Sequence, residues 1–486
     1  MRMMKVSKLK KEKQTENKTT NEGARNNFKA LSKIKYIYLV LFTMLIINLG
    51  YFVIFSSDNL VINTYNPRLA ILEKSITRGK ILDRNGDVLA ETVEYNENEH
   101  RVYPYENAFS HIVGYSHQGK TGIEALADID LLQSNISAYD QIIVELTNNK
   151  RVGNNIVTTL DKDLQLKAFE LLGKNKGAVV AIEPSTGKIL CMVSKPDFNP
   201  NEVVLNWEFL LKDEINSPLL NRATQGLYPP GSTFKILTSI QYLIENSSDS
   251  FSYECTGEDD FDGKVIHCYN NKAHGQENLK EAFTVSCNTA FATIGEGLNI
   301  DKLNKLAEQL LFNKKLPYSL PSEIGSFKLT SKNNSAQKAE TVIGQGETLI
   351  TPLHNALITS TIANGGILMK PYLIDHIENH KGKVINNNLP NVYGTLLEPS
   401  ITRTMTEYMI EVVNSGTAKQ GASEDFQIAA KTGSAENSAG DAHGWFVGFA
   451  PADNPQIVIA ILVENSGNSS YLAVPMAKEL FNTYLQ

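Results

Sequence analysis

The sequence predicts a mixed α/β (α+β) fold in which helices flank a five-stranded sheet. Two apolar, strand-like segments stand early in the chain, at residues 177–183 and 188–194. Three more follow near its end, between residues 428 and 463, and most of the chain between the two groups has the apolar spacing of helices. This order implies a sheet that closes by bringing the two ends of the folded region together.

The size and composition of the chain indicate more than one folded unit. Its 486 residues are too many for one ordinary domain, and 42% apolar with 20% charged residues is typical of a folding chain. The four cysteines, Cys191, Cys255, Cys268 and Cys287, are too few for a disulfide-dense scaffold and lack the paired spacing of a structural zinc site. We therefore expect no metal and no cofactor.

A basic tail at residues 1–35 precedes an apolar segment at residues 36–56. The tail contains 11 Lys and Arg residues against 3 acidic ones, although the whole chain has a net charge of −7. The 20 residues from Tyr36 to Phe55 carry no charge. That length is enough for a helix to cross the roughly 30 Å hydrocarbon layer of a membrane. The tail therefore points to a membrane, and we expect no nucleic-acid partner.

A cleaved signal peptide is the alternative for the apolar segment. The segment is longer than a signal's apolar core of about 7–15 residues, and no Ala-x-Ala cleavage pattern follows it. An uncleaved, single-pass anchor fits better. The excess of Lys and Arg keeps the tail in the cytoplasm, so residues 57–486 are expected on the extracytoplasmic side of the cell membrane.

Residues 57–150 are expected to form a small, β-rich, membrane-proximal module. Apolar runs at residues 76–83 and 88–93 flank an Asn-Gly pair, which favours a β-hairpin because both residues tolerate a positive φ. Support or spacing is the role that its composition favours.

The larger second domain is expected over residues 151–486. Its helices are recognised by apolar spacing and by start and stop residues such as Asp161 and Gly173. The expected helices cover residues 161–172, 232–244, 282–298, 301–311, 352–363, 403–413 and 471–485.

The helix that follows Pro230-Gly231 carries the first candidate for chemistry. Ser232 falls in its first turn, and Lys235 follows one turn later on the same face. A partly buried lysine with a lowered pKa can accept the proton of a neighbouring serine and so make it a nucleophile. The same Ser-x-x-Lys spacing recurs elsewhere in the chain, so this pair needs partners.

Two further motifs supply those partners. Ser286 and Asn288 form a Ser-x-Asn motif beside a helix, and a Lys-Thr-Gly-Ser motif lies on the first of the late strands. That strand motif consists of Lys431, Thr432, Gly433 and Ser434. None of these motifs is rare alone. Their order, at a helix start, a helix-side turn and a strand, is specific.

In this order the motifs resemble those of the penicillin-binding proteins. The resemblance extends to Gly346 with Thr351-Pro352, to residues 443–448 and to an Arg-Gly-x-Ile-x-Asp-Arg-Asn-Gly box at residues 78–86. It therefore runs from this box near the anchor to the end of the chain. No stretch between the anchor and the hairpin at residues 177–194 is long enough for a glycosyltransferase domain. The chain is therefore similar to the monofunctional class B members, which implies the penicillin-binding, β-lactamase-like transpeptidase fold.

The resemblance implies a D,D-transpeptidase that cross-links peptidoglycan stem peptides ending in D-Ala-D-Ala. Ser232 would attack the carbonyl between the two alanines and form an acyl-enzyme, with Lys235 as the base. Ser286 would relay a proton to the departing amine, and Asn288 would hold Lys235 and the substrate amide. The implied partners are stem peptides, lipid-linked precursors, β-lactams and a membrane glycosyltransferase.

The strand motif would hold the substrate. The resemblance assigns the terminal carboxylate to Lys431 and Thr432, and close approach of the substrate backbone to Gly433. The oxyanion would rest on the backbone N–H groups of Ser232 and Ser434.

Two alternatives to a transpeptidase stay open. A D,D-carboxypeptidase or β-lactamase would use water to resolve the acyl-enzyme; residues 289–430 lack the Glu-x-x-Leu-Asn segment of class A β-lactamases. A non-catalytic β-lactam sensor or scaffold is the other, and the complete motif set argues against it. Roles in division, elongation and sporulation are all compatible with these motifs.

Several remaining residues have plainer interpretations. We expect His443 to pack or to accept a hydrogen bond, and we expect no zinc at His267 or His274, which have no second ligand at metal spacing. Cys191 is expected to be a small core residue. The side chain of Cys287, the middle residue of the Ser-x-Asn motif, is expected to point away from the substrate.

A disulfide is predicted between Cys255 and Cys268. They are the two cysteines closest in sequence, a turn-rich stretch separates them, and disulfides persist outside the cytoplasm. Such a bridge would pin the segment between the Ser232 helix and the Ser286 turn. The alternative is a pair of reduced thiols.

Overall fold

The computed structural model describes residues 33–51, 75–96, 98–136, 146–147, 150–437, 440–468 and 471–486. The chain divides into two compact units, residues 1–66 and 67–486. In the first unit a helix runs from Lys33 to Tyr51 and is long and apolar enough to cross a membrane. The predicted spanning segment is therefore helical up to Tyr51. Its last five residues, and the basic tail before Lys33, lie outside the described residues.

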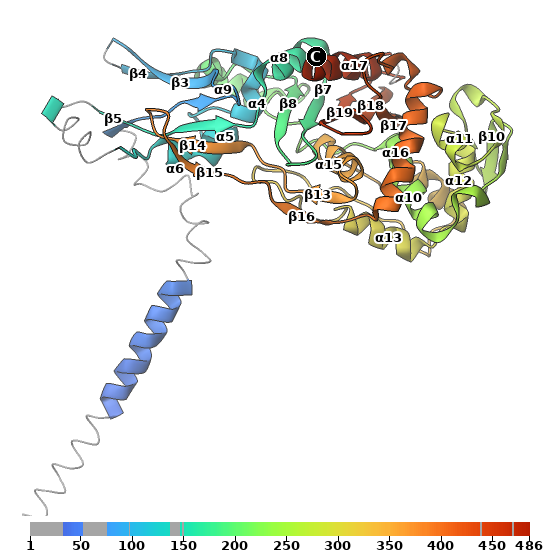
Figure 1. Cartoon of the computed structure of the whole chain (residues 1–486), viewed down its shortest axis with the longest axis horizontal. Helices are drawn as coiled ribbons and strands as arrows, with labels where there is room; N and C mark the ends of the chain where they lie inside the picture. The colour runs from blue at the N-terminus through green and yellow to red at the C-terminus, as the bar shows by residue number, and fades with distance from the viewer. Residues whose placement is uncertain are drawn as a thin grey trace, which may run out of the picture. The chain divides into compact units, whose positions relative to one another are not determined.

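The predicted five-stranded sheet is present in the second unit, with the order β17-β18-β19-β7-β8 and antiparallel pairing throughout. Its strands are β7 (Gly177–Ile182), β8 (Ile189–Lys195), β17 (Ala429–Asn437), β18 (Gly440–Ala450) and β19 (Ile457–Val463). Figure 1 shows the late strands, in red, beside the early ones, in green. The two ends of this unit therefore meet in the middle of the sheet.

Helices cover both faces of this sheet, which is why β7, β8 and β19 are buried along their whole length and are apolar except for Ser194 and Lys195. Helices α8 and α17 pack on one face, and α15 and α16 pack on the other (Figure 1). The helices of this unit with eight or more residues are α8 (Lys162–Leu172), α9 (Val203–Lys212), α10 (Lys235–Glu245), α12 (Asn288–Gly297), α13 (Ile300–Gln309), α14 (Ser335–Val342), α15 (Pro352–Ala363), α16 (Pro399–Asn414) and α17 (Ala473–Leu485).

The start and stop signals of α8 are confirmed. The Asp161 side chain caps the helix by accepting the Leu164 N–H at 3.1 Å, and Gly173 ends it with a φ of 55°. Thr351 caps α15 in the same way by accepting the His354 N–H. Thr351 is fully buried, so here it shapes the fold.

The module predicted for residues 57–150 forms a sheet that draws on three parts of the chain. Its six-stranded sheet has the order β15-β14-β6-β2-β3-β4. These strands are β2 (Ile81–Leu82), β3 (Val88–Tyr95), β4 (Asn98–Val102), β6 (Asn155–Thr158), β14 (Ile374–Glu378) and β15 (Val384–Asn387). Three of them therefore come from beyond residue 150. Short helices α4 (Ser110–Val113), α5 (Gly122–Leu126) and α6 (Asp128–Leu131) accompany the sheet.

The hairpin predicted around the Asn-Gly pair is confirmed as β2 and β3, which pair antiparallel. Of that pair, only Gly86 has a positive φ, 93°. The buried Asp83 carboxylate holds the turn by accepting the backbone N–H groups of Asn85 and Asp87, each at 2.8 Å.

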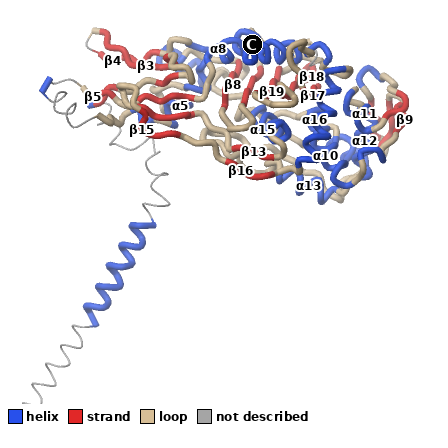
Figure 2. The backbone as a smooth tube through the Cα atoms, in the orientation of Figure 1, coloured by secondary structure: helices blue, strands red, loops and turns tan. Residues whose placement is uncertain are grey.

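Short antiparallel ribbons complete the unit. They are β9 (Tyr253–Cys255) with β12 (Gly275–Glu277), β10 (Glu258–Phe261) with β11 (Lys264–His267), and β13 (Ile367–Met369) with β16 (Val392–Thr395). Figure 2 shows β9 in red beside α12 and the short helix α11 (Leu279–Thr284). The first two of these ribbons, β9–β12 and β10–β11, bring Cys255, Cys268 and His274 to the motif at Ser286.

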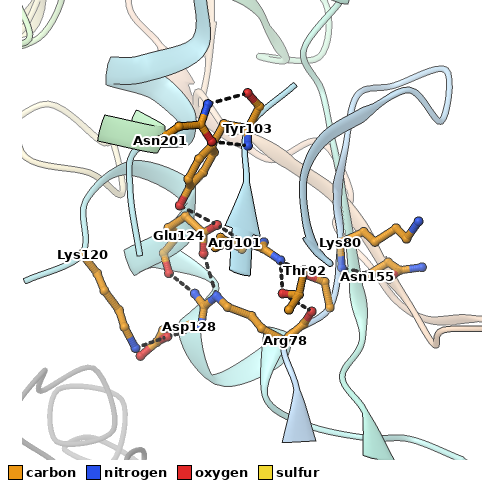
Figure 3. A network of polar contacts seen from close by, with 11 residues as sticks. Arg78, Lys80, Thr92, Arg101, Tyr103, Lys120, Glu124, Asp128, Asn155 and Asn201 are labelled. Carbon is orange, nitrogen blue, oxygen red and sulfur yellow. Dashed lines mark hydrogen bonds and ion pairs between the residues drawn. The ribbon is translucent and has the colours of Figure 1, made fainter. Parts of the chain in front are cut away.

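A buried carboxylate organises the module (Figure 3). Glu124 on α5 is fully buried and accepts hydrogen bonds from Arg78 Nε and Arg101 Nε, both at 2.7 Å. Arg78 also pairs with Asp128, which Lys120 contacts at 2.7 Å. Burial alone raises the pKa of Glu124, but the two guanidinium groups outweigh it and lower the pKa to about 2. The network thereby ties the start of the Arg-Gly box to β4, α5 and α6.

Replacing Glu124 with Gln should destabilise the protein strongly, because the buried Arg101 would lose its carboxylate partner and Arg78 would lose one of its two. Breaking a buried ion pair costs about 3–5 kcal/mol. Glu91→Gln is the matched control, since its ion pair with Lys80 is at the surface and is worth at most about 1 kcal/mol. Chemical denaturation of the full-length chain in detergent measures both. Equal, small losses in the two variants would show that the network does not support the module.

Candidate active site

Ser232 lies in a single 3₁₀ turn, η3 (Gly231–Phe234), immediately before α10 begins at Lys235. The prediction placed both residues in one helix, and the structure keeps them one turn apart with a tighter first turn. Ser232 is half-buried, whereas Lys235 is fully buried. The serine is thus accessible at the surface of a site whose amine is hidden.

Three hydrogen bonds from other elements hold the turn that carries Ser232. Trp445 Nε1 on β18 donates to the Pro229 carbonyl at 2.9 Å. The Gly231 N–H donates to the Gly344 carbonyl at 2.9 Å. Within the turn, Thr233 Oγ1 accepts from Asn355 Nδ2 on α15 at 3.1 Å. The partners Gly344 and Asn355 were not singled out from the sequence, because both are distant from Ser232 along the chain, whereas Trp445 lies in the stretch 443–448 noted above.

The Lys-Thr-Gly-Ser motif lies on β17, directly against η3. A Cβ on Gly433 would come within 3.1 Å of the Pro230 carbonyl oxygen and 3.2 Å of Thr233. The absence of a side chain at Gly433 therefore lets the Ser232 turn pack on the strand. This reason differs from the predicted approach of a substrate backbone.

The helix predicted over residues 282–298 is broken at the Ser-x-Asn motif. Helix α11 ends at Thr284, and α12 begins at Asn288. Ser286, between them, has a φ of 60°, a left-handed conformation that side-chain-bearing residues rarely adopt. The motif is therefore a strained turn, held open between two helices.

The Lys235 amine points into that turn. Its Nζ donates to the Ser286 carbonyl at 2.8 Å, to Ser286 Oγ at 3.3 Å and to Asn288 Oδ1 at 2.7 Å. The ring of Phe291 lies 5.3 Å away. The first and second motifs are thus in contact, through the amine of one and the oxygens of the other.

Lys431 approaches the same serine from the strand. Its Nζ donates to Ser286 Oγ at 2.9 Å and to the Thr432 carbonyl at 3.1 Å. Thr432 Oγ1 lies 2.5 Å from Thr417 Oγ1. Ser286 Oγ therefore lies between two lysine amines and links all three motifs.

Burial shifts the acidity of both amines. Desolvation lowers the pKa of Lys235 to about 8. Desolvation also lowers the pKa of Lys431 well below its usual value, and the charge of Lys235 lowers it further. A lysine with a pKa near neutrality can serve as a base at physiological pH.

Comparisons with known proteins support a single family. The profile of the family described as "Penicillin binding protein transpeptidase domain" matches residues 177–486, and that of "Penicillin binding protein A dimerisation domain" matches residues 78–156. The peptidoglycan D,D-transpeptidase PbpA of Mycolicibacterium smegmatis is 31% identical over 466 residues, which cover 90% of this chain and 94% of that protein. The chain belongs to the class B penicillin-binding proteins.

Solved structures agree with this assignment. Penicillin-binding protein A of M. tuberculosis, as its ceftriaxone acyl-enzyme complex, has a TM-score of 0.78 and 30% identity, and the match covers 85% of this chain and 100% of that chain. Pseudomonas aeruginosa PBP2 in complex with WCK 5153 has a TM-score of 0.72 and 30% identity, covering 85% and 96%. The transpeptidase fold predicted for this penicillin-binding protein is thereby confirmed.

The predicted disulfide of this penicillin-binding protein is wrong. All four cysteines are free, and the sulfur atoms of Cys255 and Cys268 lie 3.7 Å apart. Both sulfurs instead face a shared cluster with Cys287 and His274. The interpretation that His274 has no second ligand nearby is also wrong, since its Nδ1 lies 3.4 Å from Cys255 Sγ.

The expectations for Cys191 and His443 agree with the structure. Cys191 is buried on β8, and the Cys287 side chain is buried. His443 Nδ1 accepts the Asn465 N–H at 3.1 Å, and its ring packs edge-on against Tyr228. His267 contacts Glu258 at 3.1 Å.

Replacing Gly344 with Ala should disrupt the Ser232 turn, because the new Cβ would lie 1.9 Å from the Gly231 carbonyl oxygen. Gly346→Ala is the matched control: both glycines have a positive φ, but the nearest atom to a Cβ at Gly346 is 3.8 Å away. In the control, the free energy of unfolding should fall by only about 1–2 kcal/mol, the strain of an alanine in the left-handed conformation. In Gly344→Ala, the free energy of unfolding should fall by a further ~1–3 kcal/mol because the new Cβ overpacks the site. Denaturation of the two variants measures the difference, and equal stabilities would contradict the packing argument.

Proposed function

We propose that this penicillin-binding protein is a peptidoglycan D,D-transpeptidase that acts through a Ser232 acyl-enzyme. The observation that carries the proposal is the buried Lys235 amine, with a pKa of about 8, held one turn from Ser232 by Ser286 and Asn288. Two similar proteins support it: the M. smegmatis relative is named a peptidoglycan D,D-transpeptidase, and M. tuberculosis penicillin-binding protein A has been solved as a ceftriaxone acyl-enzyme.

Acylation begins with proton transfer from Ser232. Neutral Lys235 accepts the proton of Ser232 Oγ as that oxygen attacks the carbonyl between the two alanines of the donor stem peptide. The hydrogen bonds described for Lys235 run to Ser286 and Asn288. Such contacts can rearrange when substrate binds.

Breakdown of the tetrahedral intermediate releases D-alanine and needs a proton on its amine. Ser286 Oγ, within hydrogen-bond reach of Lys235 and Lys431, is placed to pass that proton on. The backbone N–H groups of Ser232 and Ser434 are the proposed donors to the oxyanion; losing one such donor typically costs about 3–4 kcal/mol.

The strand motif recognises the end of the donor peptide. Lys431 offers the N–H groups of its amine to the terminal carboxylate, and Thr432 offers its hydroxyl. Both side chains are buried, and Lys431 already contacts Ser286. Lys431 therefore serves carboxylate binding and proton transfer together.

The acyl-enzyme is then resolved by an amine of a second stem peptide, which forms the cross-link. A D,D-carboxypeptidase that uses water instead is the second candidate. The apolar N-terminal helix supports membrane anchoring, with catalysis on the extracytoplasmic face, where lipid-linked precursors and a partner glycosyltransferase would meet the enzyme.

Ser232→Ala should abolish covalent labelling by a fluorescent penicillin and leave the fold intact, because only the nucleophilic oxygen is lost. Lys235→Ala should slow acylation by at least ~10²-fold, the low end for loss of a general base. Ser239→Ala, which removes a buried hydroxyl from α10, is the control and should label normally.

Persistent labelling of Ser232→Ala would identify another nucleophile and overturn the assignment. The reaction class is tested on the wild type with a stem-peptide donor and an acceptor amine. Mass spectrometry should detect the cross-linked peptide. A product that has only lost D-alanine would support the carboxypeptidase.

The pH dependence tests Lys235 as the base. Its pKa is lowered to about 8, and the reactive form is neutral, so the acylation rate should rise with pH and level off above about 8. Below that pKa, each pH unit should change the rate about tenfold. Stopped-time labelling between pH 6 and 9 measures the profile. A rate that is flat or falls between pH 6 and 8 would contradict this role.

A further inference from the structure

Four metal-ligating side chains converge beside the Ser-x-Asn turn. Cys255 ends β9, Cys268 follows β11, His274 precedes β12, and Cys287 lies in the turn itself. Their ligand atoms all lie within 4.8 Å of one another. The three cysteines are buried and His274 is half-buried, so the sulfurs are shielded from solvent.

Three of the distances between these ligand atoms match the edges of a tetrahedral metal site, and the others are below 4.8 Å. Two sulfurs bound to one Zn²⁺ at about 2.3 Å stand about 3.8 Å apart, and a sulfur and a nitrogen stand about 3.5 Å apart. The structure places Cys255 Sγ 3.7 Å from Cys268 Sγ, and Cys268 Sγ 3.6 Å from Cys287 Sγ. Cys255 Sγ lies 3.4 Å from His274 Nδ1. Each of these edges fits the tetrahedron without a large movement.

We propose that Cys255, Cys268, His274 and Cys287 bind one Zn²⁺ in a closed, structural site. Three thiolates and one imidazole are a ligand set that zinc prefers, and four protein ligands leave no open position for catalysis. On binding, the three thiols release three protons to solvent, and neutral His274 coordinates through Nδ1. No oxidant or reductant takes part.

The surroundings of the cluster suit bound thiolates. Thr289 Oγ1 donates to Cys255 Sγ at 3.4 Å and lies 3.4 Å from Cys287 Sγ and 3.6 Å from Cys268 Sγ. A hydroxyl at the centre of three sulfurs is an outer hydrogen-bond partner of the kind that orients metal ligands. Thr289 is fully buried on the first turn of α12, so its position is fixed.

The site has a defined task, because Cys287 stands between Ser286 and Asn288. A metal bond to Cys287 would fix the strained turn that receives the Lys235 amine. The other ligands lie on or next to the ribbons β9–β12 and β10–β11. Asn288 Nδ2 already donates to the His267 carbonyl on β11 at 2.8 Å. Zinc would thus fasten the ribbons and the Ser-x-Asn turn into one body.

The test measures metal directly, so it does not depend on the proposed transpeptidation. Full-length protein is purified in detergent with reductant, supplied with zinc, desalted and assayed by mass spectrometry for metal. We expect about one zinc per chain. Cys268→Ser and His274→Ala should weaken zinc binding at least ~10²-fold against a competing chelator, the upper range for loss of an outer partner.

Matched controls come from the same chain. Cys191→Ala removes a buried cysteine, and His267→Ala removes a neighbouring histidine; both should retain the zinc of the wild type. Replacement of zinc by Co²⁺ in the wild type should give the d–d and thiolate charge-transfer bands of a tetrahedral site, and this readout requires no variant to fold.

Three results would overturn the proposal. One is wild-type protein that holds no zinc and shows no tetrahedral Co²⁺ spectrum. Another is equal zinc loss in the ligand variants and the controls. The third is peptide mapping under non-reducing conditions that finds Cys255 and Cys268 joined by a disulfide in the native protein.

Discussion

The site depends on keeping two lysine amines in the protein interior. Lys235 and Lys431 are fully buried, and the acceptors described for them are neutral oxygens of Ser286, Asn288 and Thr432. An ammonium group without a carboxylate partner is costly to bury, so its charged form is disfavoured and a free-base form becomes accessible. Burial without a carboxylate partner therefore makes Lys235 a base and also makes folding of the site less favourable in free energy. Every oxygen around it has to be placed by rigid structure.

That rigidity comes from elements that are remote in sequence. The turn with Ser232 is held by β17, β18 and the start of α15, whereas Ser286 is held between α11 and α12. Strand β17 reaches its place because β19 pairs with β7 and closes the sheet across the length of the domain. Fold closure and assembly of the site are consequently one event. A partly folded chain would lack Lys431 beside Ser286.

Much of the fold could be predicted because its signals are local. Strands β7 and β19, and most of β8, are continuous apolar runs, and Asp161 and Gly173 bound α8 through contacts within one turn. Ser232 and Lys235 are likewise one turn apart, so spacing alone placed them together. Their meeting with Ser286, Asn288 and Lys431 followed from the family resemblance, and the structure supplies the distances.

What the sequence did not reveal depends on distant contacts. The break at Ser286 lies inside a stretch of helical composition. Its left-handed backbone closes α11 through local bonds, with the Cys287 N–H donating to the Ala282 carbonyl at 2.9 Å, and nothing in the residue types there signals it. The four-residue cluster has no local motif, since two ribbons must pair before Cys255, Cys268 and His274 meet Cys287. Glu124 gave no signal either, because its guanidinium partners lie on β4 and near the start of the module.

The break in the helix also explains how one turn serves two amines. In an uninterrupted helix, the Ser286 carbonyl would accept the N–H of the residue four positions later and would be unavailable to a side chain. Because α11 stops at Thr284 and α12 starts at Asn288, that carbonyl accepts Lys235 Nζ instead, at 2.8 Å. The hydroxyl of the same residue is then free to face Lys431. The unfavourable φ of Ser286 is thus the condition for a single residue to present two oxygens to two buried lysines.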